Sequence, residues 1–327
     1  MRNLERIPQP PACHGARRLP APGGLVAALL AAGLSLALGA GASPARGEDE
    51  LRPPGKGASE GGYLWIGART AAPPRRVVVL APSLTDVVLA MGLGDRLAGV
   101  TRLDDAPEVA RLPRVGGFLD PNPEAVLGLS PDLVLWVTDG GALGAVRRIA
   151  ELSRASRRPF PILAIEVDSL ADVLATPRLV GDALREPARG EALARRLAGD
   201  VEAVRRRAAG LPRKRVLFVV GREPLVVAGP GSFPDELLRI CGAESVVRGE
   251  RPWPVYPVEK AVADDPDVVV DAAMQEPAEG LKRLSAIPAV RRGAVVRLRS
   301  DDLIRPGPRM IRGLDELFRG LHPGAAR

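Results

Sequence analysis

A repeated unit of helix, turn and buried strand places the strongest constraint on the fold of this chain. Its copies lie at residues 124–135 and 259–270, and in each a Glu is followed at the same offset by Pro-Asp and a run of Leu and Val. The Glu suits the first helical turn, where the helix dipole favours a carboxylate. The Pro ends the helix, because the residue before a proline avoids α geometry. An apolar run without polar alternation is typical of a strand covered on both faces, as in a parallel sheet.

One copy of the unit in each half predicts two similar α/β lobes. We expect the first lobe over residues 75–167 and the second over 213–323. Residues 168–212 show no strand pattern and predict two helices, at 169–185 and 188–209. The second would be roughly 30 Å long at 1.5 Å per residue, so it would act as a strut. The expected fold is therefore two Rossmann-like α/β lobes with central sheets, joined by a long α-helix.

The first 74 residues are expected to lie outside the lobes. Residues 1–42 combine a basic start, an apolar run at 25–38 and the small-x-small pattern Ala-Gly-Ala at 40–42, which predicts a cleaved signal peptide and a periplasmic protein. An uncleaved membrane anchor is the alternative. No Cys follows the apolar run, so a lipoprotein is not expected. Residues 43–74 are rich in Pro, Gly and charge, and predict a flexible lead-in.

Composition argues against several functional classes. Removing the signal segment lowers the formal net charge from +7 to +4, and no basic and aromatic stripe is present, so nucleic-acid binding is not expected. The remaining His is His322 and the remaining Cys is Cys241, which argues against a His-rich metal site, a Ser/His/Asp enzyme and an intrachain disulfide. We interpret Cys241 as a buried, inert thiol. Paired acids such as Asp104-Asp105 and Asp301-Asp302 are interpreted as helix and loop caps.

Further motifs carry a resemblance to a known family. They lie, in order, at residues 79–86, 90–100, 122–134, 251–259, 287–293 and 305–309. Together they resemble the helical-backbone periplasmic binding proteins that serve ABC importers of cobalamin, haem and siderophores. The resemblance covers residues 75–323, and the vitamin-B12-binding branch is the most similar.

The resemblance implies a monomer with a ligand cleft between its lobes and an importer as partner. It also implies that Glu124 and Glu259 dock onto Arg residues of a permease dimer, which works with an ATPase. Read from the residues alone, a Glu in a first helical turn is usually a solvated carboxylate that stabilises the helix.

The resemblance also points to candidate ligand contacts. In the cobalamin branch, aromatic side chains flank the corrin ring, because a large flat ligand is held by apolar contact and stacking. Phe118 stands where that branch commonly has Trp, whereas Leu103 replaces an expected Tyr and Asp302 an expected Trp. The candidate ligand-binding residues are Leu103, Phe118, Trp253, Asp302, Leu303 and Arg305. For Trp253, core packing is an equal alternative.

The expected function is the capture of cobalamin, as a transported ligand and not a cofactor, and its delivery to an ABC importer. A ferric-siderophore or haem receptor of the same fold is the alternative within the class. Haem ligation by Tyr would need Tyr63 or Tyr256, in the lead-in and beside the second repeated unit. A sensor or interaction module without a transporter is the alternative from another class.

Overall fold

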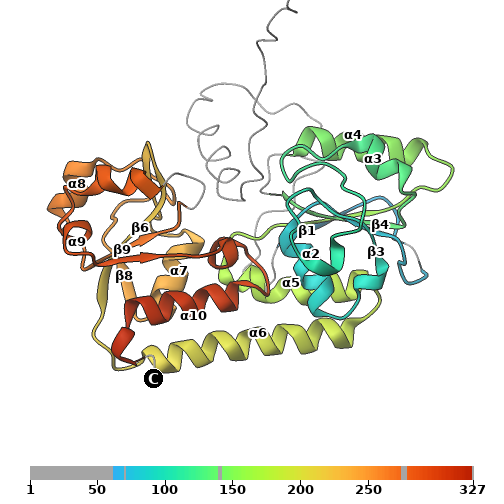
Figure 1. Cartoon of the computed structure of the whole chain (residues 1–327). Helices are drawn as coiled ribbons and strands as arrows, with labels where there is room; N and C mark the ends of the chain where they lie inside the picture. Colours follow the sequence, from blue (N-terminus) through green and yellow to red (C-terminus); the bar gives the residue numbers. More distant parts are fainter. Residues whose placement is uncertain (1–61, 70, 139–141, 274–277, 326–327) are drawn as a thin grey trace, which may run out of the picture.

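The computed structural model describes residues 62–69, 71–138, 142–273 and 278–325, and shows two α/β lobes joined by a long helix (Figure 1). The predicted fold class is thus confirmed. The proposed signal segment 1–42 lies outside the described residues. In the part of the chain that is described, no helix combines the length and apolar character needed to cross a membrane.

The N-terminal lobe is built on a five-stranded sheet with the strand order β1-β5-β4-β2-β3. Its strands are β1 (Tyr63–Ile66), β2 (Val77–Val79), β3 (Leu97–Gly99), β4 (Leu133–Val137) and β5 (Ile162–Ile165). Strands β2 to β5 pair in parallel, and β1 is antiparallel to β5 at the edge. All five residues of β4 are buried, as expected of an apolar run in a strand covered on both faces.

Strand β1 corrects the expectation for the lead-in. Residues 43–74 are predicted to be flexible, but Tyr63–Ile66 form a strand whose register places Trp65 opposite Leu163 of β5. The physical reason is that β5 would otherwise leave its backbone N–H and C=O groups unpaired at the edge of the sheet. This need comes from a strand about 100 residues away, so the local composition gives no sign of it.

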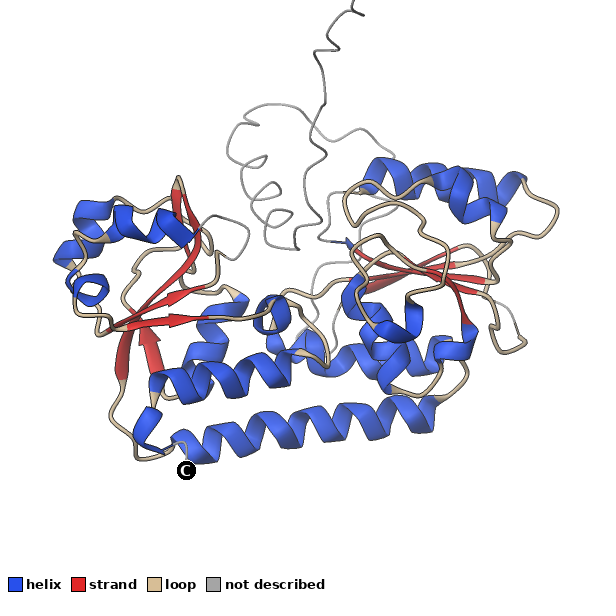
Figure 2. Ribbon diagram, viewed as in Figure 1, coloured by secondary structure: helices blue, strands red, loops and turns tan. Residues whose placement is uncertain are grey.

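Helices cover both faces of this sheet (Figure 2). They are α2 (Pro82–Ala90), α3 (Pro123–Gly128) and α4 (Leu143–Ala155), with 3₁₀ turns η2 (Gly94–Arg96) and η3 (Pro107–Val109). Alternate residues of β2 belong to different cores, with Val77 and Val79 in one and Val78 in the other. The Asn122 side chain caps α3 by accepting a hydrogen bond from Ala125 N at 2.9 Å.

The C-terminal lobe contains a second five-stranded sheet, in the order β10-β9-β6-β7 with β8 paired to β6. Its strands are β6 (Lys214–Arg222), β7 (Leu225–Val227), β8 (Ala243–Ser245), β9 (Val268–Asp271) and β10 (Val295–Arg297). Its helices are α7 (Phe233–Ile240), α8 (Val258–Ala263), α9 (Pro288–Arg291) and α10 (Met310–Leu321), with 3₁₀ turns η5 (Ala278–Leu284), η6 (Asp301–Ile304) and η7 (Pro323–Ala325). Only the β6–β7 pair is antiparallel among these described strands. The repeated unit of the sequence is therefore α3–β4 in one lobe and α8–β9 in the other.

Two helices connect the lobes: α5 (Leu170–Ala183) and the 22-residue α6 (Pro187–Ala208). A capping box between Ser169 and Asp172 begins α5. Figure 1 shows α6 running beneath both lobes, with α10 beside it. One cluster of buried side chains extends from β2 of the first lobe, through Leu197 and Val201 of α6, to Phe318 of α10. The lobes consequently share one continuous core.

Candidate ligand and docking sites

Glu124 and Glu259 occupy equivalent positions on the two lobes. Each lies in the first turn of a short helix, α3 and α8 respectively, and each side chain is exposed. Both helices lie on the side of the molecule opposite α6 (Figure 1). Neither carboxylate has an ion-pair partner among the described residues. Two exposed carboxylates on one side of the molecule are suited to accept hydrogen bonds from guanidinium groups of a partner.

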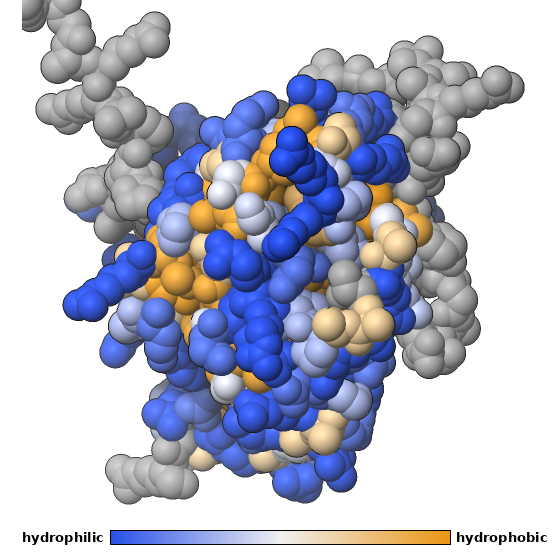
Figure 3. Space-filling view, turned by 90° about the vertical axis from the view of Figure 1, so that its right-hand side faces the viewer, coloured by the Kyte–Doolittle hydropathy of each residue, from blue (hydrophilic) through white to orange (hydrophobic). Residues whose placement is uncertain are grey.

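The end of the molecule formed by the N-terminal lobe has a predominantly hydrophilic surface. Figure 3 views this end, where hydrophilic residues surround smaller apolar areas. Many of the charges on this lobe pair with each other at the surface, as Arg148 does with Glu151 on α4 at 3.2 Å. Such exposed pairs contribute little to stability, about 0–1 kcal/mol each.

The predicted ligand residues of the N-terminal lobe lie in the chain that follows β3. Leu103 is half-buried and packs against the main core, and Phe118 is a buried member of that core, 4% exposed. Arg102, which precedes Leu103, forms a two-point ion pair with exposed Asp120 at 2.9 and 3.0 Å. That pair links the two parts of the loop that carry Leu103 and Phe118.

The predicted ligand residues of the C-terminal lobe lie in two places. Asp302 and Leu303 belong to η6, and Arg305 follows it directly. Leu303 is fully buried in the core, while Asp302 and Arg305 are 7% and 4% exposed. Trp253 is half-buried in the loop between β8 and α8 and packs against the same core.

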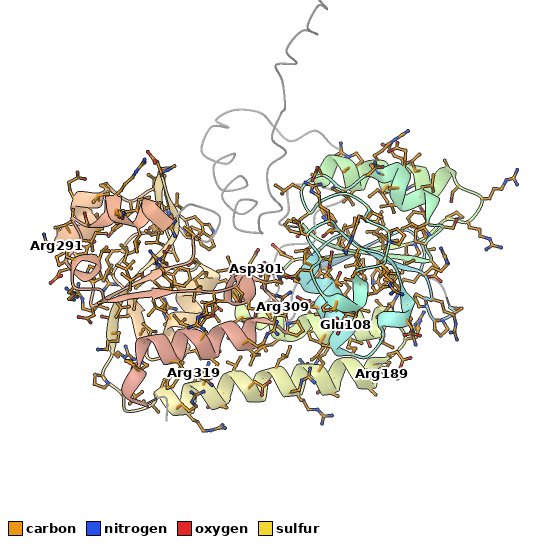
Figure 4. All side chains as sticks on the ribbon, viewed as in Figure 1. Glu108, Arg189, Arg291, Asp301, Arg309 and Arg319 are labelled. Atoms are coloured by element: carbon orange, nitrogen blue, oxygen red, sulfur yellow. The ribbon has the colours of Figure 1, made fainter. Side chains whose placement is uncertain are left out.

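The structure brings Arg305 and Asp302 into a charged cluster between the lobes, which we call the interlobe ion-pair cluster. It consists of Asp86, Asp105, Asp301, Asp302, Arg305, Arg309 and Arg312. Figure 4 shows two of its members, Asp301 and Arg309, in the space between the lobes. Asp86 on α2 and Asp105 after β3 come from the N-terminal lobe, and the other members come from the C-terminal lobe. Sequence reasoning missed the other members, which are Asp86, Asp105, Asp301, Arg309 and Arg312.

Arg305 is the centre of this cluster. Its guanidinium lies 2.6 Å from Asp301, 3.1 Å from Asp105 and 3.6 Å from Asp86. Arg309 contacts Asp105 and lies 2.7 Å from Asp302. The Asp86 oxygen facing Arg305 has no hydrogen-bond partner, because 3.6 Å is too long for one, so that contact is electrostatic. The Asp301-Asp302 pair therefore serves ion pairing, beyond the capping role expected from sequence.

Burial and charge move the carboxylate pKa values of this region in different directions. Burial raises the pKa of Asp86 to about 6, even though Arg305 and Arg309 oppose the shift. Burial also raises the pKa of Asp104, although that carboxylate accepts hydrogen bonds from the Thr101 backbone and hydroxyl at 2.7 and 2.6 Å. Burial acts in the same sense on Asp105, but the Arg309 hydrogen bond and the charges of Arg305 and Arg309 outweigh it and lower its pKa.

Two other features lie away from this cluster. A small surface hollow at the edge of the N-terminal lobe is lined by residues from β1, β4 and the end of α5, including Trp65, Arg69 and Arg185. It contains none of the predicted ligand residues. Cys241 is buried, as expected, and burial raises the pKa of its thiol to about 12, so the thiolate is disfavoured. In the described ranges, no group of three or more His, Cys, Asp or Glu side chains is placed to hold a metal ion.

Residues 77–301 match the model of the family described as periplasmic binding protein. The chain belongs to this family. Over 251 residues it is 30% identical to the vitamin B12-binding protein of Vibrio vulnificus strain YJ016, a match that covers 76% of this chain and 90% of that protein. The family consists of substrate-binding proteins of transporters, and its description gives them as periplasmic.

Solved structures show the same two-lobe architecture as this periplasmic binding protein. The periplasmic heme-binding protein RhuT from Roseiflexus sp. RS-1 matches with a TM-score of 0.67 and 28% identity, covering 77% of this chain and 99% of that one. The periplasmic vitamin B12 binding protein BtuF of Vibrio cholerae matches with a TM-score of 0.65 and 24% identity, covering 78% and 99%. At that identity the second likeness shows the fold alone.

Proposed function

We propose that this protein captures cobalamin or a related corrinoid in the periplasm and delivers it to an ABC importer. The observation that carries the proposal is the 30% identity to a vitamin B12-binding protein across 90% of that relative, which includes both lobes. The activity is binding and release of an unchanged ligand, so no catalytic residue is involved. Export through a signal peptide at residues 1–42 would place the protein in that compartment.

The ligand would bind between the lobes. Leu103 would line one side, with Phe118 packed in the core behind it, and Trp253 with Asp302 would line the other, with Leu303 packed in the core behind them. Flat, largely apolar ligands are held mainly by aromatic and aliphatic contact. Phe118 and Trp253 are the aromatic members of this group. Arg305 would hold the residues around the site in position, because its guanidinium already contacts Asp86, Asp105 and Asp301.

Delivery would use the two exposed carboxylates at the other side of the molecule. Glu124 and Glu259 would each accept hydrogen bonds from Arg residues of one subunit of the permease dimer, and the ATPase would drive release. The support for this step is that the two first-turn positions are equivalent, exposed and unpaired within the described residues. A monomer with one carboxylate on each lobe matches a permease that presents two equivalent docking surfaces.

Haem is the second candidate ligand, because the heme-binding protein RhuT is 28% identical to this chain with a TM-score of 0.67. Tyr ligation of the iron would have to use Tyr63 or Tyr256. The Tyr256 hydroxyl donates a hydrogen bond to Asp264, and the Lys260 ammonium lies over its ring. Tyr63 lies on the edge strand β1. These placements favour cobalamin over haem.

Titration of the purified protein tests the proposal directly. We expect cobalamin to quench the Trp fluorescence with saturation at one ligand per protein, and calorimetry to give a Kd of micromolar or tighter, about −8 kcal/mol or below. Haem is titrated in parallel and followed by its absorption band, and a ferric siderophore serves as the third ligand. A folded protein that ignores cobalamin would overturn the corrinoid proposal, and tight haem binding would establish the second candidate.

A further inference from the structure

The interlobe ion-pair cluster connects the two sides of the proposed ligand site through charges that belong to different lobes. Arg305 Nη1 donates a hydrogen bond to Asp105 Oδ1 at 3.1 Å, and Arg309 Nη1 donates to the same oxygen. Asp86 on α2 supplies a second carboxylate from the N-terminal lobe, 3.6 Å from Arg305. Two carboxylates of one lobe therefore face two guanidinium groups of the other.

Both arginines are also fixed within their own lobe. Arg305 Nη2 and Nε donate to Asp301 at 2.6 and 3.2 Å, and Arg309 Nε donates to Asp302 at 2.7 Å. Asp301 and Asp302 begin η6, the turn that carries the predicted ligand residues Asp302 and Leu303. A displacement of Asp105 would therefore be transmitted through Arg305 and Arg309 to η6.

The packing around the cluster leaves little freedom for the two lobes to slip at this point. Arg305 is 4% exposed and Asp86 is 7% exposed, so both charges lie in a region of low dielectric, where ion pairs are stronger than in water. Next to them, Gly307 approaches the backbone of α2 so closely that an added Cβ would lie 3.1 Å from Ser83 O. The ion pairs of Arg305 and the close contact between Gly307 and α2 therefore lie side by side and connect the same parts of the two lobes.

We propose that this cluster is the clamp that sets the separation between the two sides of the ligand site. Asp105 and Arg309 are then positioning residues, which determine ligand affinity without touching the ligand. Leu103 lies two residues before Asp105, and Asp302 pairs with Arg309, so each side of the site is directly attached to one end of the clamp. The expected effect on cobalamin affinity rests on the proposed function, whereas the role of the cluster in setting the lobe separation does not.

The first test measures the separation of the lobes without any ligand. Cys replaces exposed Arg154 on α4 and exposed Arg291 on α9, and spin labels at these positions report the interlobe distance by pulsed electron paramagnetic resonance. Cys13, in the proposed signal segment 1–42, is replaced by Ser, and the native Cys241 is buried and has a disfavoured thiolate, so neither competes for the label. We expect Asp105→Asn to broaden or shift the distance distribution.

The matched control is Glu202→Gln, which removes an exposed carboxylate that pairs with Arg205 within α6. It should leave the distance distribution unchanged. Arg309→Gln should change the distribution in the same direction as Asp105→Asn, and the double variant should show less than the sum of the two effects, because the substitutions share the Arg309–Asp105 contact. Arg309→Lys keeps the charge and should restore part of the native distribution.

The second test measures cobalamin affinity of the same variants. Asp105→Asn and Arg309→Gln should each weaken binding by about tenfold, whereas Glu202→Gln should not. An unchanged distance distribution in both Asp105→Asn and Arg309→Gln would contradict the proposal that the cluster sets the lobe separation. A loss of cobalamin affinity without a change in distance would also contradict it, because that result indicates direct contact with the ligand. If Arg309→Gln does not fold, Asp105→Asn at the more exposed position decides. Failure of the native protein to bind cobalamin would sink the proposed function but not the ligand-free distance result.

Discussion

At the scale of single residues, burial separates the acidic side chains into two groups with different chemistry. Asp120 is exposed and its two-point pair with Arg102 lies in water, where such a pair contributes about 0–1 kcal/mol. Asp86 is buried beside Arg305, and desolvation of its charge outweighs the nearby positive charges. The same residue type is therefore an ordinary surface charge in one place and a pH-sensitive group in the other.

Asp86 should make the stability of the protein depend on pH. Its pKa rises from 3.8 to about 6 on folding, so between these values the native state binds more protons than the unfolded state, and this contribution to stability falls as pH rises. The charged groups that face it are Arg305, Arg309, Asp104 and Asp105. Asp86→Asn removes this titration. We expect the variant to gain stability relative to the native chain from about pH 4 to pH 6–7, measured by denaturant unfolding at each pH. A difference that stays constant with pH would contradict this assignment.

At the scale of elements, the close contact between η6 and α10 depends on a missing side chain. Gly313 lies within α10, and an added Cβ would meet Leu303 N at 2.3 Å and Leu303 Cα at 2.4 Å. These are backbone atoms and cannot rotate away. The predicted ligand residues Asp302 and Leu303 thus keep their place on α10 only while position 313 has no side chain.

Gly313→Ala should destabilise the protein although Ala favours helices. Helix propensity alone would stabilise by about 1 kcal/mol, but forcing a methyl group into a packed contact costs about 1–3 kcal/mol. The control is Gly199→Ala in α6, where an added Cβ meets nothing within 4 Å and propensity alone should act. Thermal unfolding of both variants should show a lower Tm for the first and an equal or higher Tm for the second. The reverse order would show that η6 moves freely against α10.

At the scale of the whole molecule, one core runs through both lobes and the connecting helix α6. The interlobe ion-pair cluster adds a second connection between the lobes, above α10. The helices that carry Glu124 and Glu259, α3 and α8, lie on the side opposite α6, so a ligand site and a docking surface can act separately on one scaffold (Figure 1). Substitutions at the docking surface should accordingly affect delivery and leave ligand binding unchanged.

Glu124→Gln and Glu259→Gln should each weaken the complex with the permease by about tenfold, about 1.4 kcal/mol, because each removes a charge-assisted hydrogen bond to Arg. Cobalamin uptake by cells that depend on this importer measures the effect, and the cobalamin Kd of each variant should match that of the native protein. Glu151→Gln, an exposed carboxylate on α4, is the control. Unchanged uptake in the double variant would favour a binding module that does not serve a transporter.

The sequence by itself determined the two α/β lobes, the strut between them and the equivalence of Glu124 and Glu259, because helix caps, proline stops and apolar strands are local signals. It did not reveal β1, whose pairing partner β5 lies far along the chain. Only the tertiary structure decided that Asp105 meets Arg305, a pair 200 residues apart, and that Asp86 is buried beside them. Ion pairing and desolvation depend on distances that folding sets, so acids with identical local patterns have different roles.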